Sequence, residues 1–132
     1  MAWIHLVALL ALAQYLTFGA LVGSARGKYG VQAPATTGND VFERYYRVQM
    51  NTLELMVVLL PAMWIAAAYW DPRWAAAAGA VYLVGRRVYL RAYTRNPGSR
   101  ALGFMLSIAP IAVLILAGLI GAALRLLHGA AP

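Results

Sequence analysis

A short polar segment in an otherwise hydrophobic sequence carries side chains suited to binding a charged ligand. Arg47, Asn51 and Glu54 stand at positions i, i+4 and i+7, so an α-helix would place them on one face. Glu54 lies about three turns into a predicted membrane span, where an ionisable side chain is energetically unfavourable. We therefore expect Glu54 to face protein and to have a partner. A structural bridge to an arginine of a neighbouring helix is the alternative to a ligand.

A second polar stripe is expected in the third hydrophobic segment. Arg86, Tyr89 and Tyr93 stand at positions i, i+3 and i+7, again on one helical face. Arg87 and Arg91 form a different stripe, and we expect their side chains to extend to lipid headgroups. Anchoring at the membrane interface is the alternative interpretation of the two tyrosines.

A further arginine, Arg100, begins the last hydrophobic segment after the turn formed by residues 96–99. A helix N-terminus already favours negative charge, so an arginine there would bind an anion; anchoring by cytoplasmic positive charge is the alternative. Arginines bind carboxylates through paired hydrogen bonds, and Glu54 can accept one from an ammonium group. The combined set suits a small zwitterion with excess carboxylates, and comprises Arg26, Arg47, Asn51, Glu54, Arg86, Tyr89, Tyr93 and Arg100.

The composition predicts that these residues are positioned by helices in a membrane. Of the 132 residues, 63% are hydrophobic and 11% are charged, against about a quarter charged in soluble domains. We expect an all-α fold, a bundle of four transmembrane helices that each need roughly 20 apolar residues. The expected spans are about 3–23, 41–69, 74–95 and 101–127 within one domain, 1–132, with Asn39 or Asp40 capping the second.

The charge pattern predicts an orientation and excludes some partners. The chain has 11 Lys and Arg and 4 Asp and Glu, a formal charge of +7. Because the basic residues are interleaved with hydrophobic spans, anionic headgroups or an anionic ligand are better partners than nucleic acid. The positive-inside rule places the first and third loops in the cytoplasm and both termini outside. We expect a bacterial inner membrane, or the endoplasmic reticulum if the source is eukaryotic.

Several other chemistries lack the residues they need. There is no cysteine, which excludes disulfides, cysteine-ligated metals and a cysteine nucleophile. His5 and His128 stand alone near opposite termini, so we expect surface residues and no metal site. A four-helix multidrug exporter would carry a carboxylate in its first span, where this chain has Gln14 and no acid.

The polar pattern resembles the MAPEG family, the membrane-associated proteins of eicosanoid and glutathione metabolism. The resemblance is to the branch of cysteinyl-leukotriene synthase, leukotriene-type microsomal glutathione transferases and the lipoxygenase-activating protein. It covers residues 24 to about 100 and rests on Ser24-Ala25-Arg26, Thr36-Thr37-Gly38, Phe42-Glu43-Arg44, Arg47, Gln49, Asn51, Glu54, Val81-Tyr82-Leu83, Arg86, Tyr89, Tyr93, Arg95 and Arg100.

The resemblance implies a homotrimer of four-helix membrane bundles that binds glutathione between adjacent subunits near the cytoplasmic side. A lipophilic electrophile or lipid hydroperoxide would approach from the bilayer. Arg100 would be the catalytic residue that holds the glutathione sulfur as the thiolate. The residues expected to contact glutathione, the co-substrate, are Arg26, Arg47, Gln49, Asn51, Glu54, Arg86, Tyr89 and Tyr93.

The resemblance therefore predicts a membrane-bound glutathione transferase of detoxification or lipid metabolism, with peroxidase activity left open. A non-catalytic lipid-binding scaffold like the lipoxygenase-activating protein is the alternative. The chain departs from the family pattern at two positions. Gly27 stands where the leukotriene synthase has a second arginine, which argues against leukotriene-specific chemistry. Leu55 stands where some members have a tyrosine, which predicts slightly looser glutathione binding.

Overall fold

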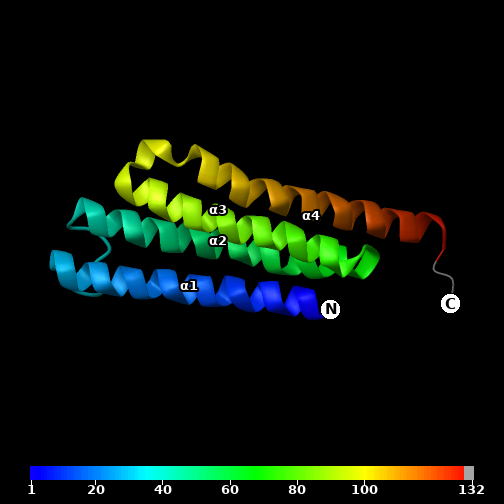
Figure 1. The fold of residues 1–132 in the computed structure, drawn as a ribbon, viewed down its shortest axis with the longest axis horizontal. Coiled ribbons are helices and arrows are strands. Elements are labelled where there is room, and N and C mark those ends of the chain that lie inside the picture. The colour runs from blue at the N-terminus through cyan, green and yellow to red at the C-terminus, as the bar shows by residue number, and fades with distance from the viewer. Residues whose placement is uncertain (130–132) are drawn as a thin grey trace.

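The computed structural model describes residues 1–129, and its secondary structure over that range is helical. Four long helices follow one another: α1 (Ala2–Tyr29), α2 (Asp40–Tyr69), α3 (Pro72–Arg95) and α4 (Ala101–Leu127), with a short 3-10 helix, η1 (Pro97–Ser99), before α4. They lie side by side along one axis (Figure 1). The α1–α2 connection and η1 lie at one end of the bundle, and the α2–α3 turn lies at the other. The predicted all-α four-helix bundle is confirmed.

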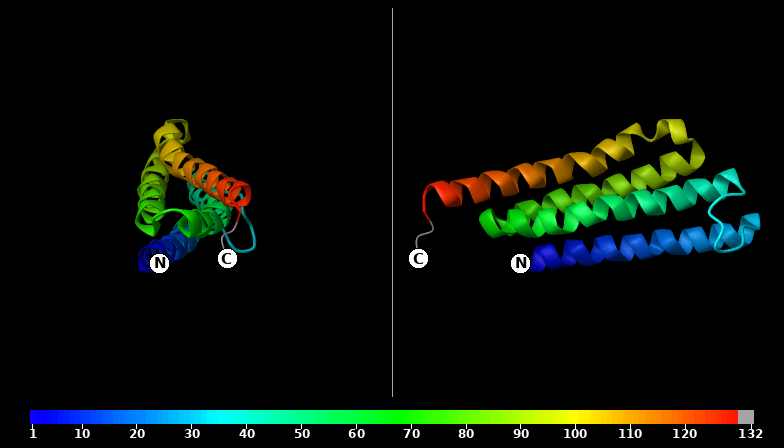
Figure 2. Two further views of the ribbon diagram at one scale, coloured as in Figure 1. Left: turned by 90° about the vertical axis from the view of Figure 1, so that its right-hand side faces the viewer. Right: turned by 180° about the vertical axis from the view of Figure 1, so that it is seen from behind.

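Three of the four helices, α1, α2 and α4, are long and apolar enough to cross a membrane. The arginines in its second half make α3 more polar than the other three helices. Its 24 residues nevertheless give it a length of about 36 Å, and it packs within the same bundle, as the end-on view shows (Figure 2). The chain is therefore a membrane protein, and its third helix is the most polar of the four.

Side-chain caps set the starts of α2 and α3. The Asn39 Oδ1 accepts hydrogen bonds from the backbone N–H groups of Val41 and Phe42, both at 3.0 Å, so Asn39 is the cap of α2. The Asp71 Oδ1 accepts from the Arg73 N–H at 2.9 Å, and proline occupies the first position of α3, where no N–H is needed. Hydrogen bonds from the side chain and backbone of Arg73 lower the pKa of the Asp71 carboxyl.

The end of α1 differs from the prediction. We expected the first span to end near Gly23, but the helix continues to Tyr29 and stops at Gly30, whose φ of 70° is left-handed. Arg26 and Lys28 therefore lie in the last helical turn and not in a loop. Polar side chains do not end a helix, and cations interact favourably with a helix C-terminus.

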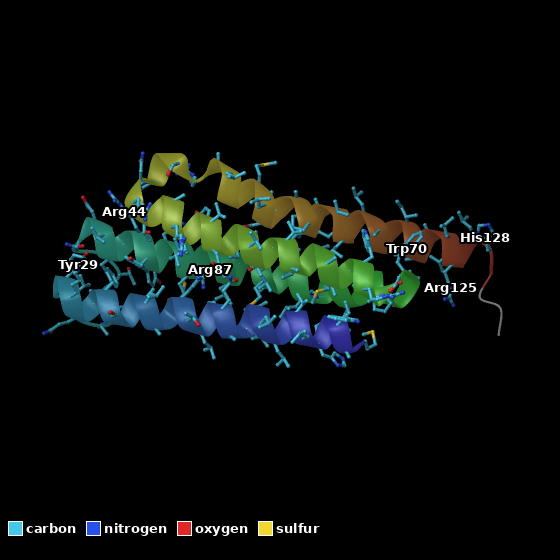
Figure 3. The ribbon with its side chains drawn as sticks, viewed as in Figure 1. Tyr29, Arg44, Trp70, Arg87, Arg125 and His128 are labelled. Carbon is cyan, nitrogen blue, oxygen red and sulfur yellow. The ribbon has the colours of Figure 1, made fainter. Side chains whose placement is uncertain are left out.

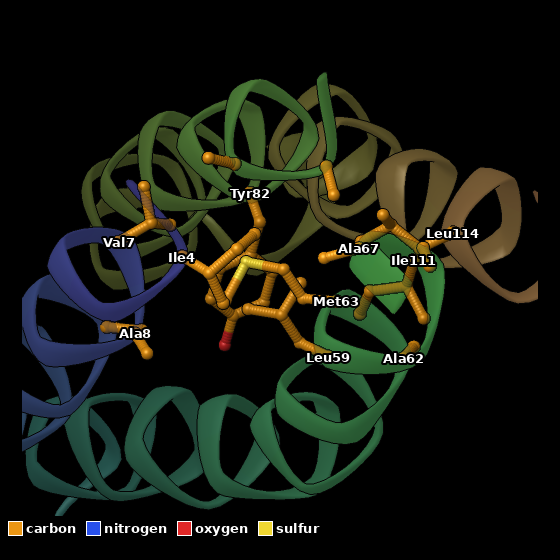
Figure 4. Close-up of a cluster of buried hydrophobic side chains, with 14 of the residues drawn as sticks. Ile4, Val7, Ala8, Leu59, Ala62, Met63, Ala67, Tyr82, Ile111 and Leu114 are labelled. Atoms are coloured by element: carbon orange, nitrogen blue, oxygen red, sulfur yellow. The ribbon is translucent and has the colours of Figure 1, made fainter. Parts of the chain in front are cut away.

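All four helices contribute to the hydrophobic core (Figure 4). Ile4 of α1, Leu59 and Met63 of α2, Tyr82 of α3 and Leu114 of α4 have none of their surface exposed. Many of the other core residues are alanines, which allow helix backbones to approach closely in a membrane. The bundle is therefore held together by close packing between small residues and a few large ones.

Glycines bring α4 against its neighbours at both ends. A Cβ on Gly103 would lie 2.4 Å from the backbone nitrogen of Tyr89, and one on Gly85 would lie 2.7 Å from the carbonyl carbon of Leu106. At the opposite end, a Cβ on Gly121 would lie 2.4 Å from the Cβ of Tyr69. The Trp70 indole N–H, next in sequence, donates to the Ala117 carbonyl at 2.8 Å.

Candidate functional site

A groove of about 730 Å³ opens between α2, α3 and the start of α4. It lies toward the end of the bundle marked by Tyr29 and Arg44, opposite Trp70, Arg125 and His128 (Figure 3). The groove brings together residues of the predicted set from three helices. Its lining comprises Arg47 and Asn51 of α2, Tyr89 and Tyr93 of α3, and Gly98, Arg100, Ala101 and Phe104 at and before the start of α4.

The α2 wall carries the predicted stripe of Arg47, Asn51 and Glu54. Arg47 Nη1 lies 3.9 Å from Glu54 Oε1, and both side chains are more than half exposed, at 57% and 60%. Glu54 is therefore not buried within a single chain, and its expected burial against protein stays a prediction. The arginine that it meets is on its own helix and not on a neighbouring one. An ion pair of this length and exposure adds little stability, so both groups remain available to a ligand or to a second chain.

The α3 wall is built from stacked side chains on one helical face. The rings of Tyr89 and Tyr93 are nearly parallel, 13° apart, with centroids 5.4 Å from each other. The Arg86 guanidinium lies 4.2 Å from the centroid of the Tyr89 ring. The predicted i, i+3, i+7 stripe is thus a continuous stack, with Arg86 deepest and Tyr93 nearest the helix end.

Two buried polar groups, one in the groove and one next to it, have no hydrogen-bond partner among the residues that the structure describes. Arg86 has none of its surface exposed, and its Nε, Nη1 and Nη2 are all unpaired within residues 1–129. The Oδ1 of Asn51, a groove residue, is likewise buried and unpaired there. Burying such groups without partners is unfavourable. The protein therefore carries a donor and an acceptor that a polar ligand or water can satisfy.

A tight turn places Arg100 at the rim of the groove. The Asn96 side chain accepts from the Gly98 N–H at 3.1 Å, and the Ser99 hydroxyl donates to the Ala92 carbonyl of α3 at 3.1 Å. Arg100 immediately precedes α4, and its carbonyl accepts from the Phe104 N–H at 3.0 Å. The exposed Arg100 side chain makes no capping hydrogen bond.

Two residues outside the predicted site set lie in or near the site: Phe104 lines the groove, and Arg44 connects α2 to α3. Phe104 follows Arg100 by four positions and so lies on the same face of α4, a spacing that could have identified it. Arg44 reaches from α2 to the end of α3, where its Nη1 donates to the carbonyls of Thr94 at 3.3 Å and Arg95 at 3.4 Å. Both contacts are long, and they join the two walls at the rim.

Four predicted residues do not line this groove: Glu54 and Arg86, described above, and Arg26 and Gln49. The Arg26 Nη1 donates to the Ala35 carbonyl at 2.6 Å, and the guanidinium lies 4.7 Å from the centroid of the Phe42 ring. Gln49 faces α1, since a Cβ on Gly19 would lie 2.8 Å from its Nε2. Within one chain, the predicted set is therefore divided between the groove and the α1–α2 face.

The remaining polar residues of the spans lie elsewhere. Arg87 is exposed and lines a separate, smaller groove with Gln14 on α1. His5 is exposed beside the Trp64 ring, and the His128 Nδ1 is 2.8 Å from the Leu124 carbonyl at the far end. Neither histidine lines the groove.

Comparisons with known proteins agree on one family. The model of the MAPEG family matches residues 4–120. Human microsomal glutathione S-transferase 2 is 38% identical over 117 residues, 89% of this chain and 80% of the relative. Guinea pig (Cavia porcellus) leukotriene C4 synthase is 34% identical over 117 residues, 82% of this chain and 78% of the relative. An uncharacterized Synechocystis protein is 45% identical over 118 residues, 89% of this chain and 86% of the relative.

Proposed function

The chain belongs to the MAPEG family, and on that premise we propose that it is a membrane-bound transferase that conjugates glutathione to lipophilic electrophiles. The observation that carries the proposal is the groove in which Arg47, Asn51, Tyr89, Tyr93 and Arg100 meet. Its cations, amide and phenols complement a peptide with excess carboxylates. Relatives named as a glutathione S-transferase and a leukotriene C4 synthase support this assignment.

The residues present fit glutathione chemically. Arg47 and Arg100 at the rim offer guanidinium groups for its carboxylates or thiolate, and Glu54 offers a carboxylate for its ammonium group. Arg86 and Asn51, whose buried polar atoms have no partner within residues 1–129, supply a further donor and acceptor. Tyr89 and Tyr93 supply phenol hydroxyls and apolar ring faces along the α3 wall.

Arg100 is proposed to activate the thiol. A free thiol has a pKa of about 8.5, so only a few per cent is ionised at neutral pH. A guanidinium beside the sulfur favours the charged form and lowers the thiol pKa by roughly one to three units. The thiolate sulfur then forms a bond to the electrophilic carbon, the leaving group departs with the bonding electrons, and the thiol proton goes to water. The protein contributes the positive charge and the positioning.

Ultraviolet difference spectra test this proposal. Wild-type protein with glutathione should show thiolate absorbance at neutral pH and should conjugate a model aryl halide. In Arg100→Ala we expect the rate at pH 7 to fall about 10- to 30-fold, as the thiolate fraction returns to a few per cent. Arg87→Ala, which removes an exposed arginine from a different groove, is the matched control. Wild-type thiolate and conjugation in Arg100→Ala would refute the role of Arg100.

We propose further that a second copy of the chain completes the site in a homotrimer. Arg26 and Gln49 lie outside the groove of their own chain, while the groove residue Arg47 and its ion-pair partner Glu54 are exposed. Arg26 of one copy would then serve the groove of its neighbour. Coexpressing Arg26→Ala and Arg100→Ala chains should give faster conjugation than either variant alone. Absence of any restored activity in verified mixed oligomers would contradict a shared site.

The proposed site places the reaction at the cytoplasmic edge of the membrane. The positively charged first and third connections lie at the groove end of the bundle, which the positive-inside rule assigns to the cytoplasm. Water-soluble glutathione would enter there, and the electrophile or a lipid hydroperoxide would come from the bilayer. A scaffold without catalysis predicts no heat on calorimetric titration with glutathione, whereas the proposed transferase predicts saturable binding.

A further inference from the structure

The contact between α3 and α4 nearest to the groove is a backbone contact at Gly103. A Cβ at this position would lie 2.4 Å from the nitrogen and 2.5 Å from the Cα of Tyr89. Carbon atoms in ordinary contact are about 3.5–4.0 Å apart. Because the atoms met are backbone and not the end of a flexible side chain, an added methyl group would force the helices apart by about 1 Å.

This contact joins α3 to the start of α4, two of the elements that line the groove. On α3, Tyr89 is a groove residue and stacks on Tyr93. On α4, Gly103 lies within the first turn, between the groove residues Arg100 and Phe104. The Gly103 carbonyl also accepts from the buried Ser107 hydroxyl at 2.7 Å, which ties this turn to the next. A shift at Gly103 therefore moves Arg100 relative to the tyrosines.

We propose that Gly103 is a positioning residue for the reaction: its lack of a side chain sets the distance of Arg100 from Tyr89 and Tyr93. The inference rests on the proposed thiolate role of Arg100. The charge of Arg100 acts on the sulfur only when the two are close, because the interaction between charges weakens with distance and with entry of water. Gly103→Ala should thus keep the charge of Arg100 but weaken its effect on the thiol pKa, because the arginine would lie further from the sulfur.

The chain supplies a control on the same helix. A Cβ on Gly121 would lie 2.4 Å from Tyr69 Cβ, as crowded as at Gly103, but at the opposite end of α4. Gly121→Ala therefore strains α4 packing without moving Arg100. Gly85 lies one helical turn before Tyr89 on α3, further from the groove. Gly85→Ala strains the same α3–α4 interface there, since a Cβ would lie 2.7 Å from Leu106.

The experiment is a pH titration of thiolate absorbance in glutathione-bound protein, with kcat and KM for an aryl halide. For Gly103→Ala we expect the thiol pKa to rise by about one unit toward its free value and kcat/KM to fall about 10- to 100-fold. Gly121→Ala should keep the wild-type titration, and Gly85→Ala should shift it in the same direction by less. If Gly103→Ala does not fold, Gly85→Ala decides the question.

The outcomes separate the two proposals. A wild-type protein with no thiolate signal would refute the proposed function, and the role of Gly103 with it. A wild-type signal together with an unshifted titration in a folded Gly103→Ala protein would refute the positioning role alone. Equal shifts in Gly103→Ala and Gly121→Ala would also refute it, because general loss of α4 packing would then explain both.

Discussion

Replacing Arg86 by methionine should stabilise the ligand-free protein and weaken its binding of glutathione. The guanidinium has none of its surface exposed, and its three nitrogens have no hydrogen-bond partner within residues 1–129. The guanidinium lies over the Tyr89 ring, 4.2 Å from its centroid. Methionine has a similar length and no charge, so Arg86→Met keeps most of the packing and removes the unpaired cation.

The two effects have opposite signs and comparable size. A buried charge without a partner costs several kcal/mol, and the aromatic contact offsets about 2 kcal/mol of that cost. Removing the charge should therefore raise the free energy of unfolding by about 1–3 kcal/mol. A hydrogen bond from a charged donor contributes about 1.5–3 kcal/mol, so losing one to glutathione should weaken binding roughly 10- to 150-fold.

Thermal unfolding and calorimetric titration of the purified protein measure both quantities. Without glutathione, Arg86→Met should unfold at a higher temperature than wild type. Saturating glutathione should raise its unfolding temperature by less than it raises that of wild type. The control is Arg87→Met, which removes the neighbouring exposed arginine and should change neither measurement. A less stable Arg86→Met protein with wild-type affinity would refute this reasoning, because Arg86 would then be a structural residue already satisfied by bound water.

Three further predictions concern the elements that hold the groove. Asn39→Ala removes both hydrogen bonds that cap α2 and should lower the free energy of unfolding by about 1 kcal/mol; no change in thermal unfolding would contradict the capping role. Tyr82→Phe removes the hydroxyl that donates to the Thr52 carbonyl at 3.3 Å. It should lower the free energy of unfolding by about 0.5–1.5 kcal/mol, which thermal unfolding also checks. The pKa of Asp71 is lowered by its hydrogen bonds from Arg73, so its cap is fully formed above the ordinary carboxyl pKa and is lost as the pH falls through the lower, folded-state value. Between these two pKa values, the stability of Asp71→Asn should accordingly depend less on pH than that of wild type. Identical profiles of stability against pH would contradict this prediction.

The sequence predicted those features that depend on local chemistry. Asn39 is one of the two predicted caps of the second helix, and residues 96–99 are a predicted turn; the structure has both. The two polar stripes follow from helical spacing alone, so Tyr89 and Tyr93 could be placed together in advance. Helix α1 runs past the predicted end of the first span near Gly23 to Tyr29, because the left-handed Gly30, and not the polarity of residues 24–29, ends it.

The rotation of one helix against another could not be predicted from spacing. Gln49 faces α1 because Gly19 leaves room for its side chain, a pairing that sequence patterns do not reveal. Glu54 is expected to face protein, but a single chain leaves its side chain largely exposed, and spacing alone does not show which surface would cover it. The Gly103–Tyr89 contact likewise depends on the crossing of α3 and α4.

Close contacts at two distant points along α4 limit how the protein can respond to bilayer thickness. Its 27 residues give a length of about 40 Å, while a typical hydrocarbon layer is about 30 Å thick. Gly103 against Tyr89 and Gly121 against Tyr69 prevent this helix from sliding along its neighbours. In a thin membrane the whole bundle must lean as one unit, or its ends must stand among the headgroups. Changes in lipid chain length should therefore alter tilt and leave the internal register of the helices intact.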